Sequence, residues 1–258
     1  MDINEIKDHM QKGLANGYRE NLLLLSAYND FVDQIQEYLL TVNVAQQLLK
    51  WNRQNGYKIR IEYPVYHFYN NAFIASDWRG TDIFNMEIIQ RKLDHAPTTK
   101  FHQKIDIVIT QEQFGGNASI NERTISGIEL KGINKSQEDI FADARRMSEA
   151  MIRTDGISSN SIKFCFCAFL RRFDKAEEMV TKRYIEQKKT EEMERWGKVC
   201  IQFAFDYPTL DFSFQQFDIQ NTPLEEIADI HKWLDSDYSE VVKDTGLVVG
   251  YILTIIRK

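Results

Sequence analysis

The 258-residue sequence is poor in proline and glycine, and it has no long hydrophobic run. Only four prolines and twelve glycines occur, and no low-complexity tract or internal repeat is present, so nothing marks a domain boundary. The longest apolar run, 247–256, is about half of the ~20 residues that a membrane-spanning helix needs, so we expect a buried strand and no membrane partner. The N-terminus lacks the apolar core of a secretory signal, which predicts a cytoplasmic protein.

Cysteine and histidine are too few and too scattered for a disulfide framework or a zinc site. The three cysteines, Cys165, Cys167 and Cys200, form no CxxC pair, and the first two lie in an apolar run. We expect reduced thiols in the core, which suits the cytosol. The histidines show no HxxxH or HxH spacing, which argues against zinc. No Gly-rich phosphate loop and no local Ser-His-Asp or Cys-His signature is present.

The chain also lacks the positive charge of a protein that coats nucleic acid. Its formal net charge is −6. Any nucleic-acid binding must therefore come from a local basic strip, a partner protein or a homo-oligomer.

The spacing of apolar residues predicts an α/β fold with a mixed sheet flanked by helices. Helices are expected within 18–51, with a break near Asn29 and a stripe of Phe31, Ile35, Leu39, Val42 and Leu49, and at 136–151, 174–196 and 223–234. Strands are expected at 58–63, 104–110, 125–133, 162–170, 199–205, 211–219 and 247–256. Segment 111–124 is expected to be a polar connection, and 66–100 an insertion of little assignable structure with a short helix at 83–93.

The triplet Glu-x-Lys occurs three times, at Glu5, Glu129 and Glu186. Residues two apart point in different directions on a helix but project from the same face of a strand. Only the triplet in TISGIELKGIN lies in an expected strand, so only Glu129 and Lys131 can serve one centre.

Asp106 is the one carboxylate in the apolar strand KIDIVIT. A buried carboxylate is costly unless it is paired or bound to a metal. If strands 104–110 and 125–133 are neighbours, Asp106 lies beside Glu129 and near Lys131. Two carboxylates and an ammonium suit Mg²⁺ and a phosphodiester substrate.

This arrangement resembles the PD-(D/E)XK nuclease superfamily, in which a glutamate-bearing helix is followed by three strands carrying an aspartate and E-x-K, and then by a helix. The resemblance covers roughly residues 30–152, from Glu37 through Asp106, Glu129 and Lys131 to the helix after Ser136. It implies a single restriction-endonuclease-like domain over 1–258, with a core of about 30–170 and C-terminal elements extending the same sheet.

By the same resemblance, Asp106, Glu129 and Glu37 would hold Mg²⁺, with Mn²⁺ as a substitute, and Lys131 would assist the attacking water. The implied activity is a metal-dependent nuclease that cuts DNA in preference to RNA, in a restriction or phage-defence setting. Ile105 stands where many members have proline, and an insertion follows the first strand.

Other interpretations of these residues stay open. The fold hosts inactive members that only bind nucleic acid or protein, and an unrelated α/β protein could keep the three charges apart. Glu37 could be a solvated helix residue, and Glu62 could be a ligand or could pair with Lys58 or Arg60. Arg145 and Arg146 could reach a phosphate or lie on a solvated helix face.

Overall fold

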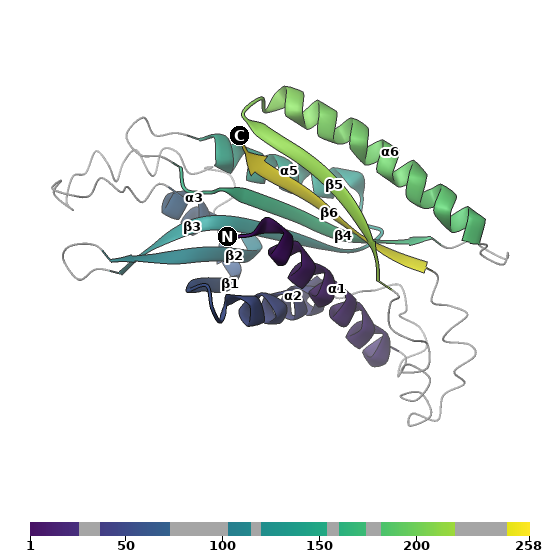
Figure 1. Ribbon diagram of the computed structural model, residues 1–258, viewed down its shortest axis with the longest axis horizontal. Helices are drawn as coiled ribbons and strands as arrows, with labels where there is room; N and C mark the ends of the chain where they lie inside the picture. Colours follow the sequence, from purple (N-terminus) through teal and green to yellow (C-terminus); the bar gives the residue numbers. More distant parts are fainter. Residues whose placement is uncertain (26–36, 73–102, 115–119, 154–159, 174–181, 220–246) are drawn as a thin grey trace.

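The computed structural model describes residues 1–25, 37–72, 103–114, 120–153, 160–173, 182–219 and 247–258. In these residues, six strands form one mixed sheet with the order β1-β2-β3-β4-β6-β5, flanked by helices (Figure 1). The strands are β1 (Tyr57–Pro64), β2 (Lys104–Phe114), β3 (Ile120–Ile133), β4 (Phe164–Phe173), β5 (Leu210–Asp218) and β6 (Leu247–Arg257). The helices are α1 (Ile3–Leu25), α2 (Glu37–Asn52), α3 (Val65–Ala72), α5 (Gln137–Ile152) and α6 (Lys182–Asp206).

The central pair of strands, β3 and β4, is parallel, whereas the other four strand pairs are antiparallel. Parallel neighbours need a long crossover, and α5 supplies it. The carboxyl ends of β3 and β4 therefore meet at the same end of the sheet. The predicted α/β mixed sheet is confirmed, while a restriction-endonuclease-like fold stays a prediction.

The sheet separates two hydrophobic cores. On one face, Leu14 of α1 and Val44 of α2 belong to a core cluster with Ile107 and Ile128 of the sheet. On the other face, α3, α5 and α6 cover the sheet, and Trp196 is fully buried there (Figure 1). Strand β4 is buried on both faces from Phe164 to Leu170, as its continuous apolar sequence predicts.

All three cysteines are free thiols, and two lie in the middle of the sheet. Burial raises the pKa of Cys165 to about 12 and holds that of Cys167 well above its usual value. Burial also raises the pKa of Cys200, on α6, to about 11. The prediction of buried, reduced thiols is confirmed for Cys165 and Cys167.

The predicted strand at 199–205 is wrong, because these residues form the last part of α6. Large apolar side chains stand at every second position, Ile201, Phe203 and Phe205, which matches the period of a strand. In the helix, Phe203 faces the core, whereas Ile201 and Phe205 are 73% and 83% exposed. The helix that begins at Lys182 thus continues through these residues to Asp206.

Within the described residues 18–25 and 37–51, the prediction of helix is correct, but the predicted buried stripe of α2 is wrong. The buried stripe of α2 runs through Leu40, Val44, Leu48 and Trp51, and the predicted stripe residue Leu49 is 52% exposed. The chain is also helical from Ile3, which the sequence prediction omits.

The predicted connection at 111–124 is too long, because β2 continues to Phe114 and β3 begins at Ile120. The predicted insertion contains a helix at its start, α3. The break near Asn29, the stripe residues Phe31 and Ile35, and the helices at 83–93 and 223–234 lie outside the described residues. No described helix is long and apolar enough to span a membrane.

Two glycines in helices should respond to alanine with opposite signs. A Cβ on Gly13 of α1 would lie 2.5 Å from the Val44 Cα of α2, whereas a Cβ on Gly197 of α6 would meet no atom within 4 Å. We expect Gly197→Ala to raise the free energy of unfolding by about 0.5–1 kcal/mol, and Gly13→Ala to lower it by about 1–3 kcal/mol. Urea denaturation measures both. A stabilising Gly13→Ala would contradict the close helix crossing.

Candidate active site

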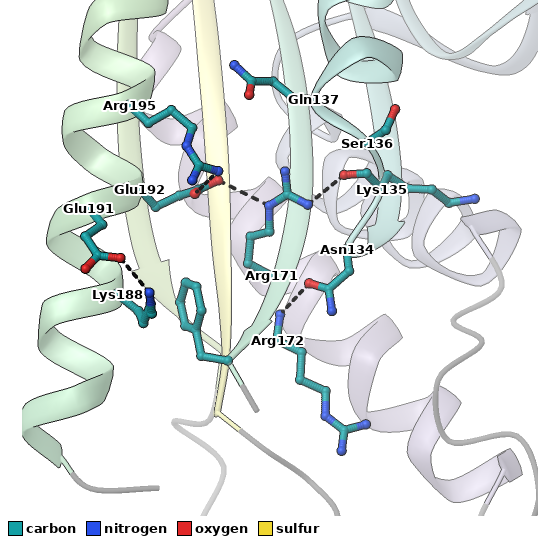
Figure 2. Close-up of a pocket in the computed structure, with 11 residues that line it drawn as sticks. Asn134, Lys135, Ser136, Gln137, Arg171, Arg172, Lys188, Glu191, Glu192 and Arg195 are labelled. Carbon is teal, nitrogen blue, oxygen red and sulfur yellow. Dashed lines mark hydrogen bonds and ion pairs between the residues drawn. The ribbon is translucent and has the colours of Figure 1, made fainter. Parts of the chain in front are cut away.

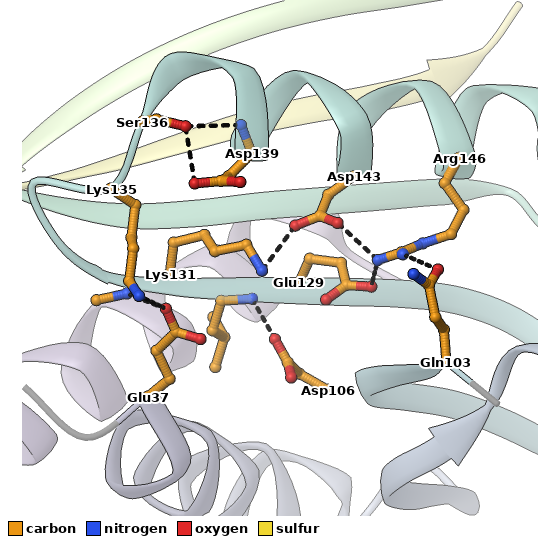
Figure 3. A network of polar contacts seen from close by, with 12 residues as sticks. Glu37, Gln103, Asp106, Glu129, Lys131, Lys135, Ser136, Asp139, Asp143 and Arg146 are labelled. Atoms are coloured by element: carbon orange, nitrogen blue, oxygen red, sulfur yellow. Dashed lines mark hydrogen bonds and ion pairs between the residues drawn. The ribbon is translucent and has the colours of Figure 1, made fainter. Parts of the chain in front are cut away.

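The site forms where β2 stops pairing with β3. Their register ends at Ile107 and Ile128, so the backbone N–H groups of β3 beyond this point have no strand partner in β2. The Leu130 N–H donates instead to Asp106 Oδ2 at 2.7 Å. The Gly132 N–H donates to Glu37 Oε1 at 3.3 Å. Two carboxylates thus line the open edge of one strand (Figure 3).

Glu129 and Lys131 lie on the face of β3 that α5 covers. Glu129 is 2% exposed and forms an ion pair with Arg146 of α5. Lys131 Nζ lies 2.9 Å from Asp143 Oδ2, also on α5. The strand period therefore brings both members of the E-x-K triplet to one place, as predicted (Figure 3).

Asp143 links the two cations of the site. Its second oxygen, Oδ1, lies 2.7 Å from Arg146 Nη2, and the Arg146 Nη1 donates to Gln103 Oε1 at 3.0 Å. Asp143 and Arg146 are both buried. Each buried charge is thus paired, which is the condition under which such groups are tolerated inside a protein.

The carboxyl groups of Asp106 and Glu129 are close enough to influence each other's ionisation. Burial raises the pKa of Asp106, while a backbone hydrogen bond from Leu130, a side-chain hydrogen bond with Glu129 and the charge of Lys131 oppose the rise. Burial raises the pKa of Glu129 well above its usual range, against the opposing effect of Arg146. Two close carboxyls that are both hard to ionise readily share a proton or a cation.

Lys131 stays protonated in this environment. Burial by itself lowers the pKa of the ammonium, but the charges of Asp143, Glu129 and Glu37 outweigh burial and raise it. Lys131 therefore serves as a fixed positive charge and hydrogen-bond donor, and it cannot serve as a general base near neutral pH.

Glu37 lies at the end of the cluster, where its Oε1 is 3.1 Å from Lys135 Nζ as well as bonded to Gly132. It is neither a free solvated residue nor joined to Asp106 and Glu129 by a direct contact.

Glu62 pairs with Lys104 at 2.9 Å, so its predicted pairing with Lys58 or Arg60 is wrong. Both of these cations pair with Glu122 instead.

The donor atoms of Asp106 and Glu129 fit a hard divalent cation. Among the described residues, no three or more His, Cys, Asp or Glu side chains are placed to hold one ion. Mg²⁺ needs fewer protein ligands, because it is usually held by one or two carboxylates and completed by water and substrate phosphate. Asp106 and Glu129 would supply these carboxylates, and Glu37 as a third ligand stays a prediction.

The sequence prediction omits Asp143, and one of its two interpretations of Arg146 is wrong. Asp143 lies one helical turn from both Ile140 and Met147, on the apolar stripe of α5. A carboxylate in such a stripe indicates a buried charge, and the sequence could have revealed Asp143 in this way. Arg146 is buried at 9% exposure, so a solvated helix face is wrong for it. Arg145, by contrast, is exposed.

Known proteins provide no independent assignment of this site, since no family model, curated protein or solved structure gives a significant match to the chain.

Replacing Asp106 by Asn should change how stability depends on pH. Because burial raises the pKa of Asp106, the folded protein binds this proton more tightly than the unfolded chain, and wild-type stability falls as the pH rises from about 4 through the raised pKa. The Asn side chain carries no such proton and can still accept from Leu130. We expect the unfolding free energy of Asp106→Asn, relative to wild type, to increase as the pH rises above about 4 in urea denaturation.

Glu191→Gln is the control for this measurement. Its exposed carboxyl has a pKa lowered by hydrogen bonds from Lys188 and Gln187, so its removal should act in the opposite direction as the pH rises. If the Asp106→Asn difference stays constant with pH, the ionised form of the half-buried Asp106 carboxyl is not destabilised as described.

Proposed function

We propose that the protein is a metal-dependent nuclease that hydrolyses phosphodiester bonds, in DNA in preference to RNA. The observation that carries this proposal is that two neighbouring strands bring together the half-buried Asp106, the buried Glu129 and Lys131. An unrelated fold in which these charges stay apart is disfavoured by the same contacts.

Each residue has a distinct role in the proposed reaction. Asp106 and Glu129 would hold Mg²⁺ or Mn²⁺, and when bound the metal would polarise a phosphoryl oxygen and acidify a coordinated water. Lys131, held by Asp143, would orient the attacking water or offset the negative charge that builds on the phosphate. Arg146 and Asp143 fix Glu129 and Lys131 in place.

The order of the elements supports membership of the PD-(D/E)XK superfamily. Apart from α3, which stands between β1 and β2, the chain runs from α2 with Glu37 through β1, β2 with Asp106 and β3 with Glu129 and Lys131 to α5. This is the order that the resemblance implies for the catalytic core. A restriction or phage-defence setting follows from the same analogy and belongs to the proposal.

A catalytically inactive binding protein of the same fold is the alternative. The ion pair between Arg146 and Glu129 favours it, because a guanidinium already occupies one of the two carboxylates that the metal needs. This alternative predicts no dependence on divalent ions and no effect of Lys131 substitutions on activity.

Metal binding should be visible without any substrate. We expect millimolar Mg²⁺ or Mn²⁺ to raise the Tm of the wild type at about pH 8, where the two carboxyls ionise more readily, and to leave the Tm of Asp106→Asn unchanged. Differential scanning calorimetry with an EDTA reference measures this. An equal shift in both proteins would place the bound ion elsewhere.

Nuclease activity should depend on the same three residues. Plasmid, single-stranded DNA and RNA are incubated with Mg²⁺, Mn²⁺ or EDTA, and Asp106→Asn, Glu129→Gln and Lys131→Met should each lower the cleavage rate by at least ~100-fold. Glu186→Gln and Lys7→Met, taken from the two helical E-x-K triplets, are matched controls that should cut normally. Undiminished cleavage by Asp106→Asn would refute the mechanism. No cleavage by the wild type would favour the binding alternative.

A further inference from the structure

A second feature lies at the same end of the sheet as the candidate active site. A pocket of about 410 Å³ opens where β3 and β4 end, between the connection from β3 to α5 and the side of α6 (Figure 2). Its volume falls in the range of small-ligand sites. In sheets with parallel strands, ligands commonly bind outside the carboxyl ends of the strands, which is where this pocket lies.

The pocket is strongly basic in a protein of negative net charge. Five of its lining side chains are Lys or Arg and two are Glu, whereas the whole chain has a formal charge of −6. The five cations are Lys135, Arg171, Arg172, Lys188 and Arg195. This pocket therefore provides the local basic surface that the chain needs to bind a polyanion.

Two glutamates line the pocket beside its five cations, and a third, Glu37, pairs with Lys135 from outside the lining. Glu192 is buried and is shared by Arg171 at 3.2 Å, Arg195 at 3.1 Å and the indole of Trp196 at 3.0 Å. Glu191 pairs with Lys188 at 2.7 Å in an exposed contact within one helix turn. Such exposed pairs are weak, so a phosphate can replace the carboxylate as partner of the ammonium.

The wall of the pocket is held in a fixed conformation. Arg171 donates to the Lys135 carbonyl at 2.6 Å, and the Arg172 N–H donates to Asn134 Oδ1 at 3.1 Å. Asn134 has a positive φ of 54° and donates its own N–H to the Leu170 carbonyl at 3.0 Å. These contacts lock the strand ends together, which lowers the conformational cost of binding a ligand.

The pocket and the candidate active site share one connection of the chain. Asn134 follows Lys131 by three residues, which span about 10 Å in extended backbone. Lys135 lines the pocket, and its ammonium pairs with Glu37 at 3.1 Å. Arg171 stacks over Phe169 in the core that α5 and α6 cover, the same face of the sheet toward which Glu129 and Lys131 point.

We propose that this pocket binds a phosphate of the substrate strand other than the one that is cleaved. The identity of the strand rests on the proposed nuclease function, whereas the preference for a phosphate rests on the pocket itself. Nucleic acid carries about one charge per 3.4 Å of each strand in a duplex, so a phosphate about three nucleotides from the scissile bond reaches the pocket. The pocket fixes the strand while Asp106, Glu129 and Lys131 act on it.

Binding measured in EDTA separates this proposal from catalysis. The affinity of fluorescent single-stranded and duplex DNA oligonucleotides is measured over a range of salt concentrations for wild type and for Lys188→Gln/Arg195→Gln. Both substituted side chains lie on the exposed side of α6, and a urea denaturation curve checks that the variant folds as the wild type does. Lys163→Gln/Lys198→Gln is the matched control, because it removes the same charge from exposed positions outside the pocket.

We expect the pocket variant to bind DNA about tenfold more weakly, and the slope of log affinity against log salt to fall by about 1.4 for single strands if both cations contact phosphates. The control variant should bind as the wild type does. An equal loss in both variants, or no DNA binding by the wild type, would overturn the proposal.

Thermal shifts with inorganic phosphate and with a mononucleotide identify the source of the phosphate. If these shifts vanish in Lys188→Gln/Arg195→Gln while its DNA binding stays unchanged, the pocket takes a free phosphate compound and the strand assignment is wrong. If the pocket variant loses DNA binding and the wild type cleaves nothing, the pocket assignment stands and the nuclease function fails.

Discussion

The separation of β2 from β3 after Ile107 and Ile128 is the constraint on which the site depends. A strand edge inside a domain must satisfy its N–H groups, and here the carboxylates of Asp106 and Glu37 accept from Leu130 and Gly132 where a paired strand would otherwise lie. Two carboxylates therefore lie at the edge of β3, a place that would be apolar if hydrophobic packing alone shaped it. The chemistry proposed for the protein arises from this local interruption of a regular ladder.

Opposite charges then make the buried acids tolerable. Helix α5 contributes both Asp143 and Arg146, so the crossover required by the parallel pair β3 and β4 also supplies the counter-charges for Glu129 and Lys131. Removing one member would leave a buried charge without a partner, at a typical cost of about 3–5 kcal/mol. The ion pair with Asp143 that makes Lys131 tolerable in the interior also keeps it protonated. The same contact therefore serves both the stability of the fold and the proposed chemistry.

Sequence reasoning located the central residues because they conflict with their surroundings. Asp106 and Glu129 are carboxylates in apolar strands, and a strand period of two joins Glu129 to Lys131 without any knowledge of the fold. The contacts of Asp143 and the true partner of Glu62 depend on how α5 and β2 approach their neighbours, which local patterns do not encode. At 199–205 the alternation of Ile201, Phe203 and Phe205 imitates a strand, and only the tertiary packing of Phe203 reveals the helix. The register of α2 was missed for a similar reason, since both faces of this helix carry leucine.

The two thiols in the middle of the sheet can report how often the core next to the candidate active site opens to solvent. Cys167 is the register partner of Glu129 on β4, and Cys165 is the partner of Gly127. Because burial keeps both sulfurs protonated and out of reach, a maleimide or disulfide reagent can modify them only when the core between the sheet and helices α3, α5 and α6 opens. Cys200, which is half-buried on α6, should be labelled faster and serves as the reference thiol. The difference in labelling rate between these positions measures how often the layer that carries the acidic pair opens to solvent.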